Sequence, residues 1–560
     1  MKKNFVRLRW FFTMLLFVTT MIMPSMMLAQ SITPTTPKGK GTAEEPYQIS
    51  TAAELYWFAG LVNGTLPDGG GKDASANAIL TDNITVNEGV LDAVNKGQVS
   101  ESDFIEWKPI GTYDSYDAVY TGTFDGKGYT ISGLYFNHPD ASYVGLFGYI
   151  GANGKISNVG VSDSYFQFRM KGGGVCGKND KDGVLQNCSN SSTVIGKNQY
   201  SRTGGVCGDN SGTVRDCKNT GSVSGENFVG GVCGINLGTI KSCYNTGSVH
   251  GTDIYVGGVC GNSYRVTNTN YCYYLSDTAT RGIGNLMADE KDKAEKMFKE
   301  QFESGEMAWL LNGKGSGEQV WGQQLGIDPS PVPGSAYKVI KAAQGDKDAN
   351  GHYTYWATFS NLKNDVTLSV PSGRKLYVYN ATVSGGKLTL TERDNQVVKE
   401  EGVLLKTDGE YVNAKANETN ELAKASSYEN HLVATPAEAT TVTAETGYIL
   451  YRLTYNDAIH KDRLGFYLGS SDGNSLKATP GKAYLKVSEN EAKAPSSAAL
   501  TRSFVFGGGS ETTGIDEITI MGTDVQRHGT IEGIFDLQGR KISNPTKGIY
   551  IKNNKKVIIK

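Results

Sequence analysis

Eight cysteines are the residues whose type and spacing could most directly support chemistry in this chain. They form four pairs, whose members lie 10 or 12 residues apart: Cys176 and Cys188, Cys207 and Cys217, Cys233 and Cys243, and Cys260 and Cys272. One disulfide within each pair would fit an exported protein. The alternative is a ladder of small, buried, unpaired thiols, one above another in successive turns of a repeat. We favour the ladder, because disulfide-dense domains are small and poor in core, whereas a stacked repeat has a large core.

Metal, cofactor and catalytic groups are not indicated. The cysteines lack CxxC spacing and a histidine at ligand spacing, so no metal site is expected. Cleavage of a polysaccharide requires two or three carboxylates, or a carboxylate with Arg or Lys, that converge from adjacent turns. The acidic residues of this region are Asp163, Asp180, Asp182, Asp209, Asp216, Glu226 and Asp253. None recurs in register, since Asp209, for example, aligns with Lys178 and Ile235. We therefore expect a protein without enzymatic activity and without a cofactor.

An aromatic stripe is the candidate for ligand binding. Tyr143, Phe228 and Tyr255 each precede a Val-Gly pair in equivalent positions of the repeat. Rings aligned along the flank of a repeat could stack on the flat apolar faces of sugars. The alternative is that these rings pack at a corner of each turn, and the two interpretations remain open.

A second recurring type is asparagine in the motif CGxN, at Asn179, Asn210 and Asn236. We interpret these asparagines as turn residues that hydrogen-bond their own corner, or as a ladder of stacked amides. One acidic residue also occupies a position that is polar in other segments: Asp216 aligns with Asn187 and Ser242.

The cysteines and the CGxN asparagines lie in four similar segments, 172–196, 204–225, 230–251 and 257–274. Each segment holds three short β-like pieces that Gly or Asn-Gly turns separate, which is typical of one coil of a parallel β-helix. A single coil cannot bury its apolar side, so neighbouring coils must stack. A helix is predicted over Thr51 to Val62, with Ser50 or Thr51 as N-cap and Gly64 as stop, where it could cover the first coil. A second helix is predicted within 291–311, at the other end.

The segments resemble the GLUG repeat of exported proteins from Bacteroidetes-like bacteria. The similarity continues through entry motifs at 39–64, 107–111, 120–136 and 143–148 and closing motifs at 271–277, 302–313 and 320–332. The resemblance implies a right-handed parallel β-helix, and it implies no chemistry. We place this β-helix at 39–283, followed by a helical closing segment and Pro-rich linker at 284–334.

The second half of the chain has a different pattern. Short alternating strands are predicted at 353–360, 366–370, 375–381, 387–392, 403–407, 448–455, 464–469 and 482–487. Turn residues separate many of them, which is typical of an antiparallel sandwich or barrel. We assign 335–506 to a β-sandwich region, which resembles an accessory domain found near the C-termini of large Bacteroidetes surface proteins.

The two ends of the chain indicate export. Residues 1–29 have the basic start, the apolar centre and the small residue before cleavage that mark a signal peptide. Residues 507–560 resemble the C-terminal sorting tail of type IX secretion, which implies a small β tail domain and contact with export machinery. No other stretch is long and apolar enough for a membrane span, so the mature chain is expected to have no transmembrane helix.

Composition narrows the function classes. The chain has 70 glycines in 560 residues, a larger fraction than the usual ~7%. This glycine content favours many tight turns. The net charge of −2 argues against nucleic acid as a partner. We expect an adhesin-like protein at the outer-membrane surface or outside the cell, which binds glycans or extracellular or host surface proteins along the β-helix. The alternatives are a polysaccharide lyase or glycosidase on the same scaffold, or a structural spacer that presents the C-terminal sandwich.

Overall fold

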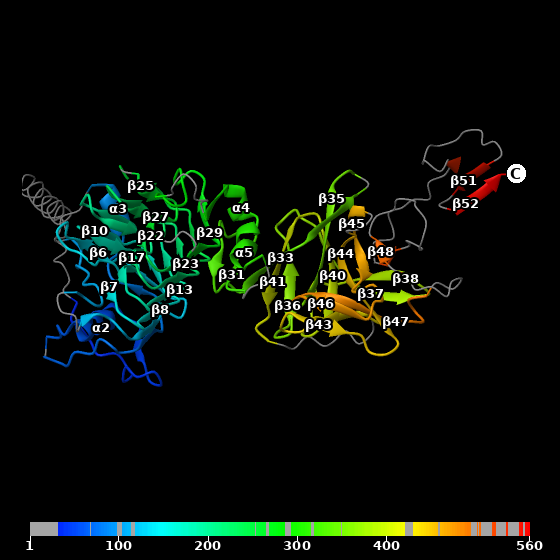
Figure 1. Ribbon diagram of the computed structural model, residues 1–560. Coiled ribbons are helices and arrows are strands. Elements are labelled where there is room, and N and C mark those ends of the chain that lie inside the picture. The colour runs from blue at the N-terminus through cyan, green and yellow to red at the C-terminus, as the bar shows by residue number, and fades with distance from the viewer. Residues whose placement is uncertain are drawn as a thin grey trace, which may run out of the picture. The chain divides into compact units, whose positions relative to one another are not determined.

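The computed structural model describes residues 32–505 and the backbone of four short strands beyond them. Omitted within this range are positions 68, 98–102, 114–117, 253, 265–267, 286–292, 315–318, 349, 420–428, 457–459, 494–500 and 502, and the side chains of 456 and 460–463. The predicted signal peptide lies outside the described residues. The chain divides into two compact units, 1–336 and 337–560 (Figure 1).

The first unit is a parallel β-helix in which each coil adds one strand to each of several parallel sheets. Sheet A contains β1 (Tyr47–Ile49), β2 (Ala78–Leu80), β4 (Thr123–Asp125), β8 (Lys155–Ser157), β13 (Val184–Gln186), β18 (Thr213–Arg215), β23 (Thr239–Lys241) and β28 (Thr269–Asn270). Sheet B contains β3 (Ile84–Thr85), β5 (Thr130–Ser132), β9 (Gly160–Ser162), β14 (Ser189–Asn190), β19 (Lys218–Asn219), β24 (Tyr244–Asn245), β29 (Cys272–Leu275) and β30 (Ala294–Met297).

Three further sheets complete each coil. Sheet C contains β6 (Tyr135–Asn137), β10 (Tyr165–Phe168), β15 (Thr193–Gly196), β20 (Val223–Ser224) and β25 (Val249–His250). Sheet E contains β11 (Lys171–Gly173), β16 (Arg202–Gly204), β21 (Val229–Gly230) and β26 (Val256–Gly257). Sheet D contains β7 (Phe147–Ile150), β12 (Cys176–Asn179), β17 (Cys207–Asn210), β22 (Cys233–Asn236) and β27 (Cys260–Ser263). The predicted parallel β-helix is confirmed, but a repeated coil consists of five short strands and not of three.

The extra corners arise where the sequence permits sharp bends. Between sheets A and B every repeated coil has one residue in the left-handed backbone region, with φ between 52° and 56°. These residues are Asn158, Asn187, Asp216, Ser242 and Tyr271. Asn and Asp tolerate this conformation better than other side chains. Asp216 is therefore a corner residue, ion-paired to Arg215 at 2.9 Å, and the predicted alignment with Asn187 and Ser242 is confirmed.

The N-terminal end of the stack is covered as the sequence predicts. Helix α2 (Ala52–Asn63) begins after the N-cap Thr51 and ends at Gly64, whose φ is 72°. Its Phe58 is fully buried against the core of the first coils. A second short helix, α3 (Val90–Asn95), was not predicted.

At the far end the prediction is partly wrong. Within the range 291–311 that was predicted as helical, the described residues form strand β30, then α4 (Lys299–Glu303) and α5 (Glu306–Leu311). Strand β30 pairs in register with β29, and its Ala294 and Met297 are buried. Sheet pairing therefore overrides the helical preference of this charged segment. Helices α4 and α5 pack with Tyr244 and Trp321 of β31 (Trp321–Gly322), which pairs with β32 (Val332–Pro333).

The second unit stacks antiparallel sheets in three layers. Sheet G contains β33 (Tyr337–Lys341), β41 (Tyr411–Ala416), β36 (Val366–Ser369) and β39 (Gln396–Val397). Sheet H contains β34 (Ala343–Lys347), β35 (Tyr353–Ser360), β40 (Gly402–Thr407), β37 (Leu376–Ser384), β38 (Lys387–Arg393) and β49 (Ile518–Met521). Sheet I contains β42 (Leu432–Ala434), β47 (Ala483–Ser488), β44 (Tyr448–Asn456), β45 (His460–Leu468) and β48 (Ser503–Val505).

Sheet H is the middle layer, because its strands alternate between two cores. Ala357 and Phe359 of β35 pack toward sheet G, whereas Trp356 packs toward sheet I. A small sheet of β43 (Thr440–Thr443) and β46 (Ser475–Ala478) adds to this unit. The antiparallel arrangement predicted for this region is confirmed.

The predicted tail lies mostly outside the described residues. Its strand β49 pairs in parallel with β38 of sheet H, so this part of the tail joins the second unit. Strands β50 (Ile534–Phe535), β51 (Gly548–Lys552) and β52 (Lys555–Ile559) form a separate antiparallel sheet.

Candidate binding surface on the β-helix

The three aromatic residues of the predicted stripe lie in one column at the start of sheet E. Strand register aligns Val144 with Gly172 of the next coil. It then aligns Gly172 with Thr203, and Thr203 with Val229, in the two coils that follow. The residues just before these positions form the outer column, which consists of Tyr143, Lys171, Arg202, Phe228 and Tyr255. The three rings occupy equivalent positions, but the stripe is interrupted, because Lys171 and Arg202 stand between Tyr143 and Phe228.

A second column lies beside the first, on sheet D. Register aligns Tyr149, Lys178, Asp209, Ile235 and Asn262 in successive coils, and we call these residues the inner column. The alignment of Asp209 with Lys178 and Ile235 is confirmed. The outer column and Lys178 are half-buried and reach solvent, whereas Tyr149, Asp209, Ile235 and Asn262 are buried beside them. Together the two columns give this face an aromatic end, a charged centre and a second aromatic end.

Three tyrosines form the first aromatic end. The rings of Tyr143 and Tyr149 stack with centroids 5.5 Å apart and planes 8° apart. Tyr113 lies against both, at 5.1 Å from Tyr143 and 5.5 Å from Tyr149, and it is 37% exposed. Lys171 Nζ lies 5.1 Å from the Tyr143 centroid and Lys178 Nζ lies 4.8 Å from the Tyr149 centroid. We call Tyr113, Tyr143 and Tyr149 the tyrosine platform.

The second aromatic end is a pair. Phe228 and Tyr255 stack with centroids 4.9 Å apart, and both rings are half-buried. Phe228 has a φ of 50° and Tyr143 a φ of 64°, in the left-handed region. This conformation costs an aromatic residue about 1–2 kcal/mol, which the surrounding coils must offset. The fold therefore holds both rings at the edge of sheet E in spite of the local backbone preference.

The charged centre contains a buried carboxylate. Asp209 has a side chain only 3% exposed, and its Oδ2 atom contacts Lys171 Nζ at 3.0 Å and Arg202. Its Oδ1 atom has no hydrogen-bond partner among the described residues. Two cations thus neutralise one acid that is sealed from water, and both cations keep part of their surface exposed.

Lys178 extends this network toward the platform. Its Nζ atom donates to Tyr149 Oη at 2.9 Å, and Tyr149 Oη donates to Asp180 Oδ2 at 2.9 Å. Burial lowers the pKa of Lys178, but the hydrogen bond to Tyr149 and the charges of Asp180 and Asp209 outweigh it and raise that pKa overall. Lys178 is therefore positively charged at neutral pH.

Sequence reasoning missed Lys171, Lys178 and Arg202 as parts of this surface. The motif that aligns the coils, GGVCG, begins at Gly173 and Gly204, and the two cations of the outer column stand two positions before it in coils without an aromatic residue. The signal that could have found them is the alignment itself, extended by two residues on its N-terminal side.

The eight cysteines form two interior columns and contain no disulfide. Cys176, Cys207, Cys233 and Cys260 are paired in register on sheet D, and all eight thiols are buried and unpaired. In the other column the backbone N–H of Cys188 donates to Cys217 Sγ at 3.4 Å. Burial raises the pKa of the Cys188 and Cys217 thiols well above its usual value, which keeps them protonated and unreactive. Their role here is packing.

Asparagine ladders run beside the cysteines. The predicted one is confirmed, because Asn179 Nδ2 donates to Asn210 Oδ1 and Asn210 Nδ2 donates to Asn236 Oδ1, each at 2.8 Å. A second, unpredicted ladder joins Asn190, Asn219 and Asn245 at 2.8 and 2.7 Å. Its sequence signal is an asparagine two residues after the second cysteine of each of the first three pairs.

Among the described residues, one group of metal-type ligands occurs in the second unit, at Glu429, His431 and Glu491. His431 Nδ1 accepts a hydrogen bond from the Val383 N–H at 3.1 Å, so the neutral ring carries its proton on Nε2. This Nε2 faces Glu429 Oε1 at 3.3 Å. A metal at Nε2 would need that atom deprotonated, so the geometry favours a hydrogen bond over a metal site.

Comparison with known proteins gives partial matches. No family model matches the chain. It is 30% identical over 176 residues to Halomucin of Haloquadratum walsbyi, which covers 31% of this chain and 2% of that protein. It is 34% identical over 127 residues to a "Putative Gly-rich membrane protein" of Evansella cellulosilytica, covering 23% of this chain and 12% of that protein. The chain thus spans only a small part of these curated relatives.

Among solved structures, the chain is similar to a "putative immunoglobulin A1 protease" from Bacteroides ovatus. The identity is 18%, the match covers 53% of this chain and 94% of that one, and the TM-score is 0.38. No helix in the described part of the chain has the length and apolar character that a membrane crossing requires.

Proposed function

We propose that this protein is exported, acts at the cell surface or outside the cell, and binds glycans without catalysis on the two-column surface of its β-helix. The observation that carries the proposal is the tyrosine platform beside Lys171 and Lys178. Sugar rings present flat apolar faces that stack on aromatic rings, and their hydroxyl and acidic groups accept hydrogen bonds from lysine and arginine.

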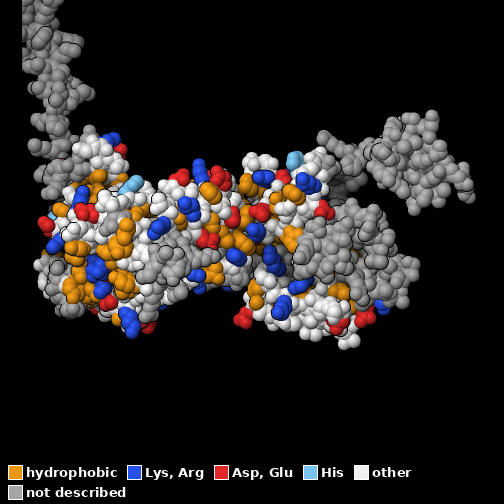
Figure 2. Space-filling model, turned by 45° about the horizontal axis from the view of Figure 1, so that its top comes forward, with side chains coloured by type: hydrophobic (Ala, Val, Ile, Leu, Met, Phe, Trp, Pro, Cys, Tyr) orange, Lys and Arg blue, Asp and Glu red, His pale blue; other side chains and the backbone are white. Residues whose placement is uncertain are grey.

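The location is supported by separate observations. The sequence predicts a signal peptide at 1–29, and the name of one partial relative includes the word membrane. The four similar segments between 172 and 274, with the entry and closing motifs around them, also support assignment of the coils to the GLUG type. Charged side chains of both signs are interspersed over the face visible in Figure 2, which fits a ligand recognised locally and not through a broad basic field.

The absence of catalysis is part of the proposal. Asp180 lies 3.8 Å from Lys178 and accepts a hydrogen bond from Tyr149, and Asp209 is ion-paired with Lys171 and Arg202. These contacts engage both oxygens of Asp180 and the Oδ2 atom of Asp209, and the Asp209 Oδ1 atom is sealed from water, so neither carboxylate is placed to act as a general acid or base. Incubation with the bound polysaccharide should release no new reducing ends and no unsaturated sugars, and release of either would contradict this part.

A glycan array tests the binding directly. The full mature chain should bind a subset of glycans, and Tyr113→Ala should weaken that binding by about tenfold or more, as expected for the loss of one exposed stacking ring. Tyr353→Ala is the matched control, because Tyr353 is 45% exposed in the second unit and also lies below a lysine, Lys347 at 4.8 Å. Equal losses in the two variants, or no binding at all, would contradict the proposal.

A further inference from the structure

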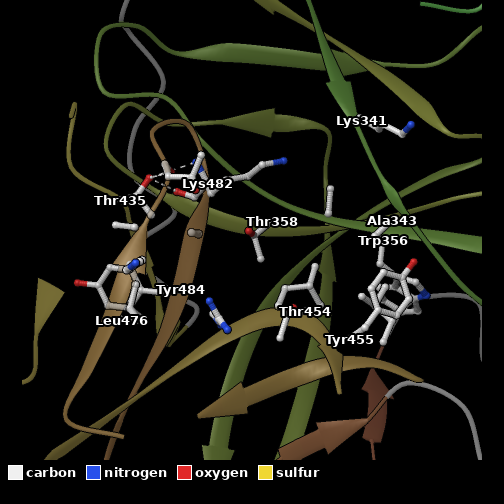
Figure 3. A pocket seen from close by; sticks show the side chains of 18 residues that line it. Lys341, Ala343, Trp356, Thr358, Thr435, Thr454, Tyr455, Leu476, Lys482 and Tyr484 are labelled. Atoms are coloured by element: carbon white, nitrogen blue, oxygen red, sulfur yellow. Dashed lines mark hydrogen bonds between the residues drawn. The ribbon is translucent and has the colours of Figure 1, made fainter. Parts of the chain in front are cut away.

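A cavity of about 350 Å³ lies within the second unit, between sheet H on one side and sheet I with the small β43–β46 sheet on the other. Strands β34 and β35 line one side, and β44, β46 and β47 line the other. In Figure 3, Thr435, Lys482 and Tyr484 lie at one end of the cavity and Trp356 and Tyr455 at the other. Cavities of ~300–1,000 Å³ are the size that small-molecule ligands fill.

The charge of the lining has one sign. Four basic side chains line the cavity, Lys341, Arg452, Lys477 and Lys482, and the described lining includes no Asp or Glu. Lys341 lies 4.0 Å from Glu410. No described carboxylate pairs with Arg452, Lys477 or Lys482.

Lys482 is placed in the wall by its backbone. Its N–H donates to Thr435 Oγ1 at 3.2 Å, and Thr435 Oγ1 donates to the Lys482 carbonyl at 2.9 Å. The side chain is half-buried, and burial lowers the pKa of its ammonium group. A cation held in this way at the cavity, without a carboxylate partner among the described residues, is stabilised by an anion that enters.

The remaining lining is suited to a ring that carries hydroxyl groups. The hydroxyls of Thr358 and Thr454 line the cavity, and neither has a hydrogen-bond partner among the described residues. Leu464 and Leu476 supply an apolar wall. The cavity is therefore larger and more varied than a site for a bare inorganic anion needs to be.

We propose that this cavity binds an acidic saccharide, a sugar ring that carries a carboxylate or sulfate group. Arg452, Lys477 and Lys482 neutralise the acidic group, Thr358 and Thr454 hydrogen-bond ring hydroxyls, and the leucine wall contacts the ring face. The site is separate from the tyrosine platform and does not depend on it.

Calorimetric titration of the full mature chain tests this assignment with three sugars: digalacturonate, sulfated galactobiose and neutral galactobiose. At least one acidic sugar should bind tenfold or more tightly than the neutral one, and the tighter acidic sugar identifies the acidic group. Raising the salt concentration should weaken this binding, because charge pairs at an open cavity are screened. Equal binding of the neutral sugar, or no binding of either acidic sugar, would overturn the proposal.

The variants avoid loss of folding. Arg452 and Lys477 are exposed, so the double variant Arg452→Ala/Lys477→Ala should fold and lose tenfold or more in affinity for the acidic sugar. Lys363→Ala removes an exposed lysine outside the cavity and should change affinity less than twofold. Tyr113→Ala should also leave it unchanged, which separates this site from the platform. Unchanged affinity in the double variant, or full competition by an equal concentration of inorganic sulfate, would contradict a saccharide site here.

Discussion

Lys171 Nζ lies 3.0 Å from the Oδ2 atom of Asp209, a carboxylate that belongs to the next coil of the β-helix. Arg202, from the same coil as Asp209, contacts the same oxygen. One buried acid thus links two coils and holds two cations of the outer column at the centre of the proposed binding surface. The ion pairs position the charges that flank the tyrosine platform.

This arrangement predicts that removing the two cations destabilises the fold more than removing the acid. Replacing Lys171 and Arg202 together by methionine leaves the Asp209 charge buried without its two ion-pair partners, which should lower the free energy of unfolding by about 3–5 kcal/mol. Asp209→Leu should cost much less, because the side chains of Lys171 and Arg202 are 15% and 32% exposed and can turn to water. Urea unfolding of both variants measures the difference. A larger loss for Asp209→Leu would show that the acid, and not its neutralisation, stabilises the coils.

The cysteine columns predict a specific thiol count. A thiol reagent at pH 8 should modify none of the cysteines in the folded protein, because all eight are buried. In denaturant without reductant it should modify all eight. Fewer than eight reactive thiols in denaturant would indicate disulfides, and rapid reaction of the folded protein would mean that the columns open.

The asparagine ladder predicts that the stability lost on removing one amide depends on the place of that amide in the ladder. Asn210 both accepts from Asn179 and donates to Asn236, so Asn210→Ala leaves polar groups on both neighbours without that partner and should cost about 2–4 kcal/mol. Asn179 stands at the end of the ladder, and its Oδ1 atom has no partner among the described residues. Asn179→Ala should therefore cost less. The denaturant concentrations at the midpoints of unfolding, compared at equal slope of the transitions, measure both losses of stability. A larger loss for Asn179→Ala than for Asn210→Ala would contradict the prediction.

The cap of helix α2 predicts a pH dependence. Burial raises the pKa of Glu54, but hydrogen bonds from Ser50 and Thr51 outweigh it and lower that pKa below its ordinary value of 4.5. A depressed carboxyl pKa stabilises the fold above the unfolded pKa, and this contribution is lost as the pH falls through the folded pKa. Glu54→Gln keeps an oxygen acceptor but does not titrate. The stability difference between wild type and Glu54→Gln should thus be constant from pH 7 to pH 5.5 and shrink below pH 4.5. A constant difference down to pH 3 would refute this assignment.

The repeat period made the cysteine columns and the first asparagine ladder predictable. Once Cys207, Cys233 and Cys260 are aligned, stacking of coils places every equivalent residue in one column. Helix α2 was predictable because its cap residues, Thr51 and Gly64, act locally. Strand β30 was not, because its pairing with β29 is a tertiary contact that outweighs local helical preference.

The binding surface was only partly predictable. Aromatic residues at equivalent positions marked the outer column, but a search for one residue type passes over coils in which a cation replaces the ring. Lys171 and Arg202 become part of the surface only when the columns are read across coils. Tyr113 enters from outside the four repeat segments, and only the folded chain brings it against Tyr143 and Tyr149.

The most direct test of glycan binding on the β-helix is hydroxyl-radical footprinting of the full chain with and without a glycan identified on the array. If the platform holds the glycan, oxidation of Tyr113 should fall several-fold on binding, whereas oxidation of Tyr353 should stay the same. Unchanged oxidation of Tyr113 at a glycan concentration that saturates the protein would place the binding elsewhere and contradict the proposed surface.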